Sequence, residues 1–105
     1  MSAIFIYITV PSETEAQKIA EAVVAERLAA CANIVPGMKS VYHWQGKIEQ
    51  GNEIILIFKT RAGLFPAVEA RVRELHSYST PCIVSLPLTD VSDGFMQWIL
   101  AETKP

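Results

Sequence analysis

Two strand-like segments of unusual length constrain the fold more than any other feature of this sequence. Residues 32–44 and 47–60 both read as strands, and Gln45-Gly46 lies between them. Glycine can adopt the positive φ that a tight hairpin turn requires, so the two segments are predicted to form one long hairpin. Pro36-Gly37 predicts a bulge or kink in the first strand, and Gln50-Gly51-Asn52 suggests a second irregularity in the return strand.

The length of this hairpin predicts an oligomer. A strand of about ten residues spans roughly 33 Å, whereas a domain of this size has a radius of gyration of about 13 Å. Strands usually have about five or six residues, and an isolated two-stranded ribbon is marginal in water. We therefore expect the hairpin around residues 39–52 to pack on a neighbouring subunit or to add strands to it. The alternative is a bent hairpin that folds back on its own sheet.

Strand and helix patterns alternate through the rest of the chain. Residues 3–10 form an apolar run that is typical of a buried strand. Ser12 and Glu15 then make the Ser-x-x-Glu pattern that begins many helices. A second amphipathic helix is predicted over residues 64–76, because its apolar residues recur at helical spacing.

The C-terminal part completes the order of elements. A strand is predicted from Pro81 through Leu88, and Ser92 is predicted to cap a short final helix. The resulting βαββαβ order with a terminal helix is the split βαβ arrangement of ferredoxin-like folds. We therefore predict an α+β ferredoxin-like sandwich with two helices on one face of the sheet, formed by a single domain over residues 1–105.

Composition excludes several classes of protein. Half of the 105 residues are hydrophobic, which indicates a globular chain. The formal net charge of −2 argues against binding to nucleic acid, which requires a basic surface. Residues 3–10 are too few to span a membrane, and no positive segment precedes them. Because Cys31 and Cys82 make no disulfide framework, we expect a cytoplasmic protein.

Two charged residues mark one face of the return strand. Side chains alternate along a strand, so Glu53 and Lys59 share a face with the apolar Ile55 and Ile57. Such a face is expected to be partly buried, and charges in such places are usually paired or functional. An ion pair at the rim of a subunit interface is the structural alternative.

His76 and Cys82 are the candidate metal ligands. His76 is predicted at the end of the second helix, and Cys82 follows after a short loop. Imidazole and thiolate are ligands for copper and zinc, although a third ligand would be needed. His76 could instead cap helix carbonyls, because a helix C-terminus favours a cation. We expect His43 to be a surface residue and Cys31 to be a small core residue.

Several catalytic and binding motifs are absent from the sequence. It has no Cys-x-x-Cys, no Gly-x-Gly-x-x-Gly and no P-loop. It also lacks the aromatic pattern of an RNA-recognition sheet and any supported Ser-His-Asp or Cys-His arrangement. No enzyme activity is therefore predicted.

The chain resembles the CutA family, which is named for tolerance of divalent cations. The resemblance rests on motifs that run in order through nearly the whole chain: residues 27–34, Ser40-x-Tyr42-x-Trp44-x-Gly46-Lys47-Ile48, residues 53–60, His76-x-Tyr78 and Trp98-Ile99. It implies a ferredoxin-like subunit that forms a compact homotrimer through long strands, much like the PII signalling proteins. It also implies a role in metal-ion tolerance, with copper or other divalent cations as ligands and no established enzyme activity. Animal members suggest a scaffold role.

The resemblance implies a metal site that this chain keeps only in part. His76 matches the family's histidine, and Ser77 replaces the proline that usually follows it. Cys82 stands where members commonly carry glutamate, and a cysteine of some members would fall at Ile8. Thiolate in place of carboxylate would favour Cu(I) or Zn(II).

The resemblance also implies a cleft between subunits. The residues that match positions around the family's cleft are Glu53, Lys59, Tyr42, Trp44 and Tyr78.

Three hypotheses about the function follow from the sequence. The first is a trimer that binds copper, zinc, another divalent metal ion or a small ligand at these clefts. The second is a structural module that scaffolds partner proteins. The third is an enzyme with Glu53 and Lys59 as its polar pair.

Overall fold

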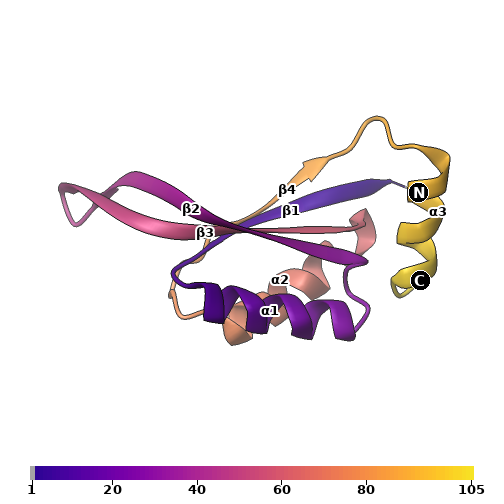
Figure 1. Ribbon diagram of the computed structural model, residues 1–105, viewed down its shortest axis with the longest axis horizontal. Coiled ribbons are helices and arrows are strands. Elements are labelled where there is room, and N and C mark those ends of the chain that lie inside the picture. The colour runs from indigo at the N-terminus through magenta and orange to yellow at the C-terminus, as the bar shows by residue number, and fades with distance from the viewer. Residues whose placement is uncertain (1) are drawn as a thin grey trace.

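The computed structural model describes residues 2–105 and confirms the predicted order of elements (Figure 1). Strands and helices alternate as βαββαβ, and a third helix follows the last strand. The elements are β1 Ala3–Val10, α1 Glu13–Ala25, β2 Cys31–Trp44, β3 Lys47–Arg61, a 3-10 turn Ala62–Leu64, α2 Phe65–Leu75, β4 Ile83–Pro87 and α3 Asp93–Glu102.

The four strands form one antiparallel sheet in the order β2-β3-β1-β4. The chain thus has the predicted α+β ferredoxin-like fold. Helices α1 and α2 lie side by side on one face of the sheet, and α3 lies at the end where β1 begins (Figure 1). The opposite face of the sheet has no such pair of helices over it.

The core lies between the sheet and the two helices. Side chains alternate along β1 and β3, so every second residue of each strand points toward α1 and α2. Ile6 pairs with Phe58 across these strands, and both side chains are fully buried together with Leu56. Ile19 of α1 and Val72 of α2 close the core from the helix side. Burying each such side chain stabilises the fold by about 1.5–3 kcal/mol.

The first helix begins as predicted, but only half of the capping box forms. The Ser12 hydroxyl oxygen accepts a hydrogen bond from the Glu15 backbone N–H at 3.2 Å. The Glu15 carboxylate does not return to Ser12; it accepts instead from the backbone N–H of Ser77 at 2.9 Å. The side chain that sequence reasoning assigned to helix capping therefore tethers the loop after α2.

The last helix is fixed at its C-terminal end. Ser92 occupies the predicted N-cap position, but its hydroxyl makes no capping hydrogen bond. The buried Arg61 guanidinium donates from Nη2 to the Leu100 carbonyl at 2.6 Å and from Nε to Thr103 Oγ1 at 2.9 Å. A cation at this end also suits the helix dipole. Arg61 therefore joins the end of β3 to α3.

The hairpin of β2 and β3 extends beyond the rest of the molecule. It projects past the end of β1 as a two-stranded ribbon (Figure 1), and the molecule measures 45 × 25 × 22 Å along its principal axes. The alternative of a hairpin folded back on its own sheet is therefore wrong for this chain. The predicted turn is confirmed, with positive φ at Gln45 (52°) and Gly46 (79°).

One of the two predicted irregularities is present. The register shifts between Val35 and Met38, where two residues of β2 lie opposite one residue of β3, and Gly37 has a φ of 84°. This is the bulge that Pro36-Gly37 predicted. The second prediction was wrong, because residues 50–52 pair regularly with residues 39–41. Gly51 provides room for Tyr42, whose hydroxyl would lie 3.7 Å from a Cβ at this position.

Large apolar side chains are exposed on the hairpin and on the open sheet face. Val35, Val84 and Leu86 on the open face are 43%, 48% and 47% exposed. Val41 and Ile48 on the hairpin are 66% and 70% exposed. These side chains lie on both faces of the sheet and ribbon, and apolar surface of this kind, where it is contiguous, usually marks an interaction site. No helix within residues 2–105 combines the length and the apolar character needed to cross a bilayer.

Candidate functional site

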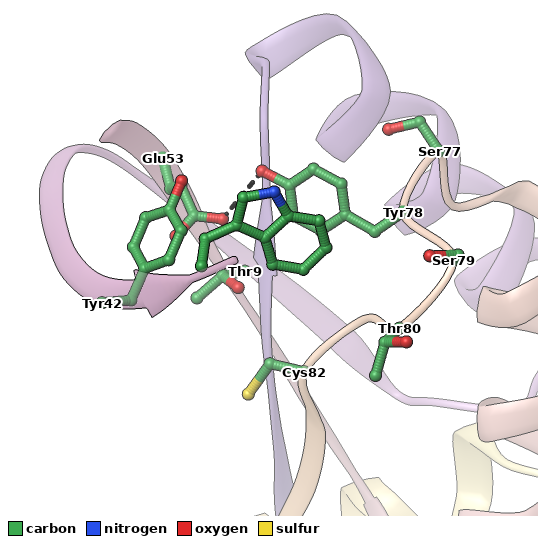
Figure 2. A pocket seen from close by; sticks show the side chains of 9 residues that line it. Thr9, Tyr42, Glu53, Ser77, Tyr78, Ser79, Thr80 and Cys82 are labelled. Carbon is green, nitrogen blue, oxygen red and sulfur yellow. Dashed lines mark hydrogen bonds between the residues drawn. The ribbon is translucent and has the colours of Figure 1, made fainter. Parts of the chain in front are cut away.

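A pocket of about 590 Å³ lies at the base of the hairpin. One side is formed by Tyr42, Trp44 and Glu53 of the hairpin, and the other by the loop of residues 76–82 that joins α2 to β4. Thr9, near the end of β1, also lines the pocket (Figure 2). The structure therefore brings together five residues that were singled out from the sequence at separate places: Tyr42, Trp44, Glu53, Tyr78 and Cys82.

Glu53 is the one charged residue that lines this pocket. It lies half-buried on the open face of β3, and each carboxylate oxygen accepts one hydrogen bond from a hydroxyl. Ser40 Oγ donates to Oε1 at 2.6 Å, and the Tyr78 hydroxyl donates to Oε2 at 3.0 Å (Figure 2). No Lys, Arg or His within residues 2–105 forms an ion pair with it. The pocket thus holds a negative charge that is oriented but not neutralised.

The charge of Glu53 affects its neighbours. Burial most of all, together with the hydrogen bond to Glu53 and the negative charge of Glu53, raises the pKa of Tyr78 to about 12. Burial also raises the pKa of the Cys82 thiol, and the Glu53 charge raises it further. At neutral pH Tyr78 is therefore a hydrogen-bond donor, and Cys82 is a thiol.

His76 holds the loop of the pocket in place. Its Nδ1 accepts a hydrogen bond from the Tyr78 backbone N–H at 3.0 Å. The ring proton therefore resides on Nε2, which donates to the Thr9 carbonyl oxygen at 2.8 Å. The alternative that the ring caps carbonyls of its own helix is thus wrong. The ring also packs on Tyr78 with 4.8 Å between ring centroids, so it positions that side chain.

Ser77 adds a second anchor to the same loop. Its backbone N–H and its hydroxyl donate to the same oxygen of Glu15, at 2.9 Å and 3.1 Å. A proline at this position could make neither bond because it lacks both donors. Ser77 therefore fixes the loop through polar contacts that a proline would remove.

The proposed metal ligands do not form a ready site within one chain. His76 has both ring nitrogens in hydrogen bonds and a fully buried side chain. Cys82 lines the pocket as a thiol whose pKa is raised, whereas a metal needs the thiolate. No cluster of three His, Cys, Asp or Glu side chains suited to a metal ion occurs within the described part of the chain. These residues therefore do not fit copper or zinc, and metal binding stays a prediction.

Lys59 lies far from the pocket. It is six residues beyond Glu53 on β3, a separation of about 20 Å along the strand. Its ammonium group lies 5.6 Å from the ring centroids of both Phe5 and Phe95. Lys59 and Glu53 share the predicted strand face, but one chain does not bring them together.

Other residues of the site differ from their predicted roles. His43 is exposed at the hairpin tip, as predicted, whereas Cys31 is half-buried at the start of β2 and is not a core residue. Sequence reasoning missed Ser40 as a partner of Glu53. Because it lies two residues before Tyr42 on the same strand, alternation could have placed it on the pocket face. The role of Glu15 had no such signal, since its partner is distant in sequence.

The structure defines a small ferredoxin-like domain with an extended hairpin and a pocket beside it, and comparisons with known proteins identify its family. The family model described as CutA1 divalent ion tolerance protein matches residues 4–102. The chain belongs to this family. It is 46% identical over 98 residues to the divalent-cation tolerance protein CutA of Thermus thermophilus, covering 93% of this chain and 95% of that one.

A plant relative and a solved structure extend the comparison. The chain is 41% identical over 102 residues to the chloroplastic protein CutA of Arabidopsis thaliana, covering 97% of this chain but only 56% of that relative. It superposes on the periplasmic divalent cation tolerance protein CutA of Archaeoglobus fulgidus with a TM-score of 0.95 and 43% identity, covering 97% and 99% of the two chains. Because that name places a relative in the periplasm, the cytoplasmic location expected here stays a prediction.

Proposed function

We propose that this chain acts in tolerance of divalent cations as a homotrimeric binding protein, and that its ligand occupies the pocket at the base of the hairpin. The pocket of about 590 Å³ carries the proposal. Its volume lies within the range of roughly 300–1,000 Å³ that is usual for small-molecule sites. It also has a few oriented polar groups among aromatic side chains, as such sites do. The proposal includes no catalytic step.

The exposed apolar surface supports the assembly. Trp44 is 55% exposed and Ile48 is 70% exposed on a ribbon that extends beyond the sheet (Figure 1). An isolated two-stranded ribbon is marginally stable in water, so contacts with other copies would stabilise it. Because the pocket lies at the base of this ribbon, a neighbouring subunit would complete its wall.

A small ligand fits the pocket better than a metal ion coordinated by the chain alone. Glu53 is a single carboxylate, whereas copper and zinc sites need several nitrogen, sulfur or oxygen ligands. Copper or zinc held by His76 and Cys82 would require the ring of His76 to give up a hydrogen bond. We keep this metal site as the alternative binding mode.

Two experiments test the proposal. Light scattering coupled to gel filtration should give the mass of three chains at micromolar concentration, and a folded monomer would contradict the assembly.

The second experiment measures the role in tolerance. In a bacterial host without its own CutA gene, the chain should restore growth in added copper or zinc. A Glu53→Gln variant should restore less growth at equal protein level. Equal growth with and without the wild-type chain would contradict the role in tolerance.

A scaffold role is a second candidate. Val41 is 66% exposed on the hairpin face that turns away from the pocket residues, so a partner protein could bind there without entering the pocket. Repeated recovery of one partner by the wild-type chain, and its loss with Val41→Ser, would favour this role. Recovery of the same partner by both chains would contradict it.

A further inference from the structure

We propose that the pocket at the base of the hairpin binds a small organic ammonium ion, with Glu53 as its counter-charge and Tyr42, Trp44 and Tyr78 as its aromatic walls. This inference rests on the proposed function and deepens it, because it names the class of ligand that the same pocket takes. It follows from the charge, the walls and the size of the pocket.

The charge of the pocket selects a cation. Glu53 is its one charged lining residue, and the two groups bonded to it, Ser40 and Tyr78, are neutral hydroxyls. His76 does not line the pocket, and its ring nitrogens are bonded to the Thr9 carbonyl and the Tyr78 backbone N–H. Burying a carboxylate without a cationic partner costs free energy, so a half-buried Glu53 favours the binding of a cation. Phosphates and carboxylates would be repelled.

The walls select an organic cation. Aromatic faces attract ammonium groups through the negative potential of their π-systems, and such cages are a recurrent way to bind alkylated amines. Tyr42 and Tyr78 approach Glu53 from two sides (Figure 2), and Trp44 also lines the pocket. A hydrated metal ion gains little from such walls, because it needs oxygen, nitrogen or sulfur ligands around it.

The hydrogen bonds preorganise the site. The Tyr78 hydroxyl and the Ser40 hydroxyl each occupy one oxygen of Glu53, which fixes the carboxylate while leaving further lone pairs on each oxygen. Tyr78 is in turn held by His76 through its backbone N–H. The ammonium group would therefore meet a carboxylate whose position is already set, with little ordering on binding.

Calorimetric titration with choline provides the test. The matched probe is 3,3-dimethyl-1-butanol, which has the same shape as choline but a carbon in place of the charged nitrogen. We expect saturable choline binding and at least about tenfold weaker binding of the neutral alcohol. Glu53→Gln, which removes the charge and keeps an acceptor oxygen for one of the two hydroxyls, should weaken choline binding by about tenfold or more. Trp44→Leu should weaken it several-fold.

Glu49→Gln is the control variant. Glu49 lies on the same strand and carries the same charge, but it does not line the pocket. Choline affinity should change less than about twofold in this variant, because its charge is exposed and screened. A similar loss in Glu49→Gln and Glu53→Gln would overturn the inference, since it would show only general attraction by a negative surface.

Further outcomes separate this inference from the proposed function. Equal affinity for choline and the neutral alcohol would overturn the inference, and so would the absence of saturable choline binding. If the same sample is a trimer by light scattering and restores growth in copper or zinc, the proposed function survives that result. If choline binds through Glu53 but the chain restores no growth, the ligand class holds and the role in tolerance fails.

Discussion

The Tyr78 hydroxyl and the Glu53 carboxylate meet at 3.0 Å, although they are 25 residues apart in the sequence. This hydrogen bond joins the loop after α2 to the return strand of the hairpin. It closes the pocket on one side and orients the only charge within its lining. The bond therefore connects the two walls of the pocket.

The first prediction concerns the titration of Tyr78. The pKa of its phenol in the folded protein is about 12, above the ordinary value of about 10. Its contribution to stability is therefore fully present below pH ~10 and is lost as the pH rises through about 12. The difference in absorbance at the tyrosinate band between the wild-type chain and Tyr78→Phe should develop near pH 12. A difference that is complete near pH 10 would contradict this.

The second prediction concerns the reactivity of Cys82. Burial and the Glu53 charge raise the pKa of this thiol, so its alkylation by iodoacetamide should be slower at pH 8 than that of free cysteine. In a Cys31→Ser background, where Cys82 is the single thiol, Glu53→Gln should speed the reaction several-fold. An unchanged rate would show that Glu53 does not influence the thiol.

The third prediction concerns Arg61. Replacing it with Met leaves the Leu100 carbonyl and the Thr103 hydroxyl without their charged donor. Hydrogen bonds to charged groups contribute about 1.5–3 kcal/mol, so the free energy of unfolding should fall by about that amount. Arg73→Met is the control, because Arg73 forms an exposed pair with Glu69 on α2. Its loss should cost less than about 0.5 kcal/mol in urea denaturation.

The fourth prediction concerns the bulge in β2. Gly37 has a φ of 84°, which L-residues rarely adopt, so Gly37→Ala should destabilise the chain by about 1–2 kcal/mol. Gly63→Ala is the matched control, because Gly63 has no positive φ and nothing near its missing Cβ. It should be neutral or stabilise the fold by up to about 1 kcal/mol. Equal effects in thermal unfolding would contradict the strain at Gly37.

Much of the fold could be predicted from local patterns. The apolar run at residues 3–10, the helical periodicity after Ser12 and the glycine of the turn each depend on residues close in sequence, and the structure confirms the elements they predicted. Gly51 misled the prediction, because it pairs regularly with Ser40 and does not interrupt the strand. A glycine that a regular strand tolerates and a glycine that breaks a strand look the same in a sequence.

The candidate site could be predicted only in part. Glu53 and Tyr78 were identified as site residues, but their mutual hydrogen bond depends on how the loop after α2 folds back toward the hairpin. His76 looked like a metal ligand because imidazole serves both as a ligand and as a hydrogen-bonding anchor. Its contacts with the Thr9 carbonyl and the Tyr78 backbone N–H, which only the structure reveals, show that the ring serves as a hydrogen-bonding anchor.

The bulge at Gly37 also determines which side chains the hairpin presents to the pocket. Before the bulge the odd-numbered Val35 shares the open sheet face with Ile55, whereas after it the even-numbered Met38 shares that face with Glu53. A regular strand of the same length would turn Val41 toward the pocket and Tyr42 away from it. The bulge therefore keeps Tyr42 on the same face as Glu53. A single-residue deletion between the bulge and Tyr42, with regular pairing kept, would exchange an aromatic lining for an aliphatic one, which offers evolution a one-step route to a different specificity.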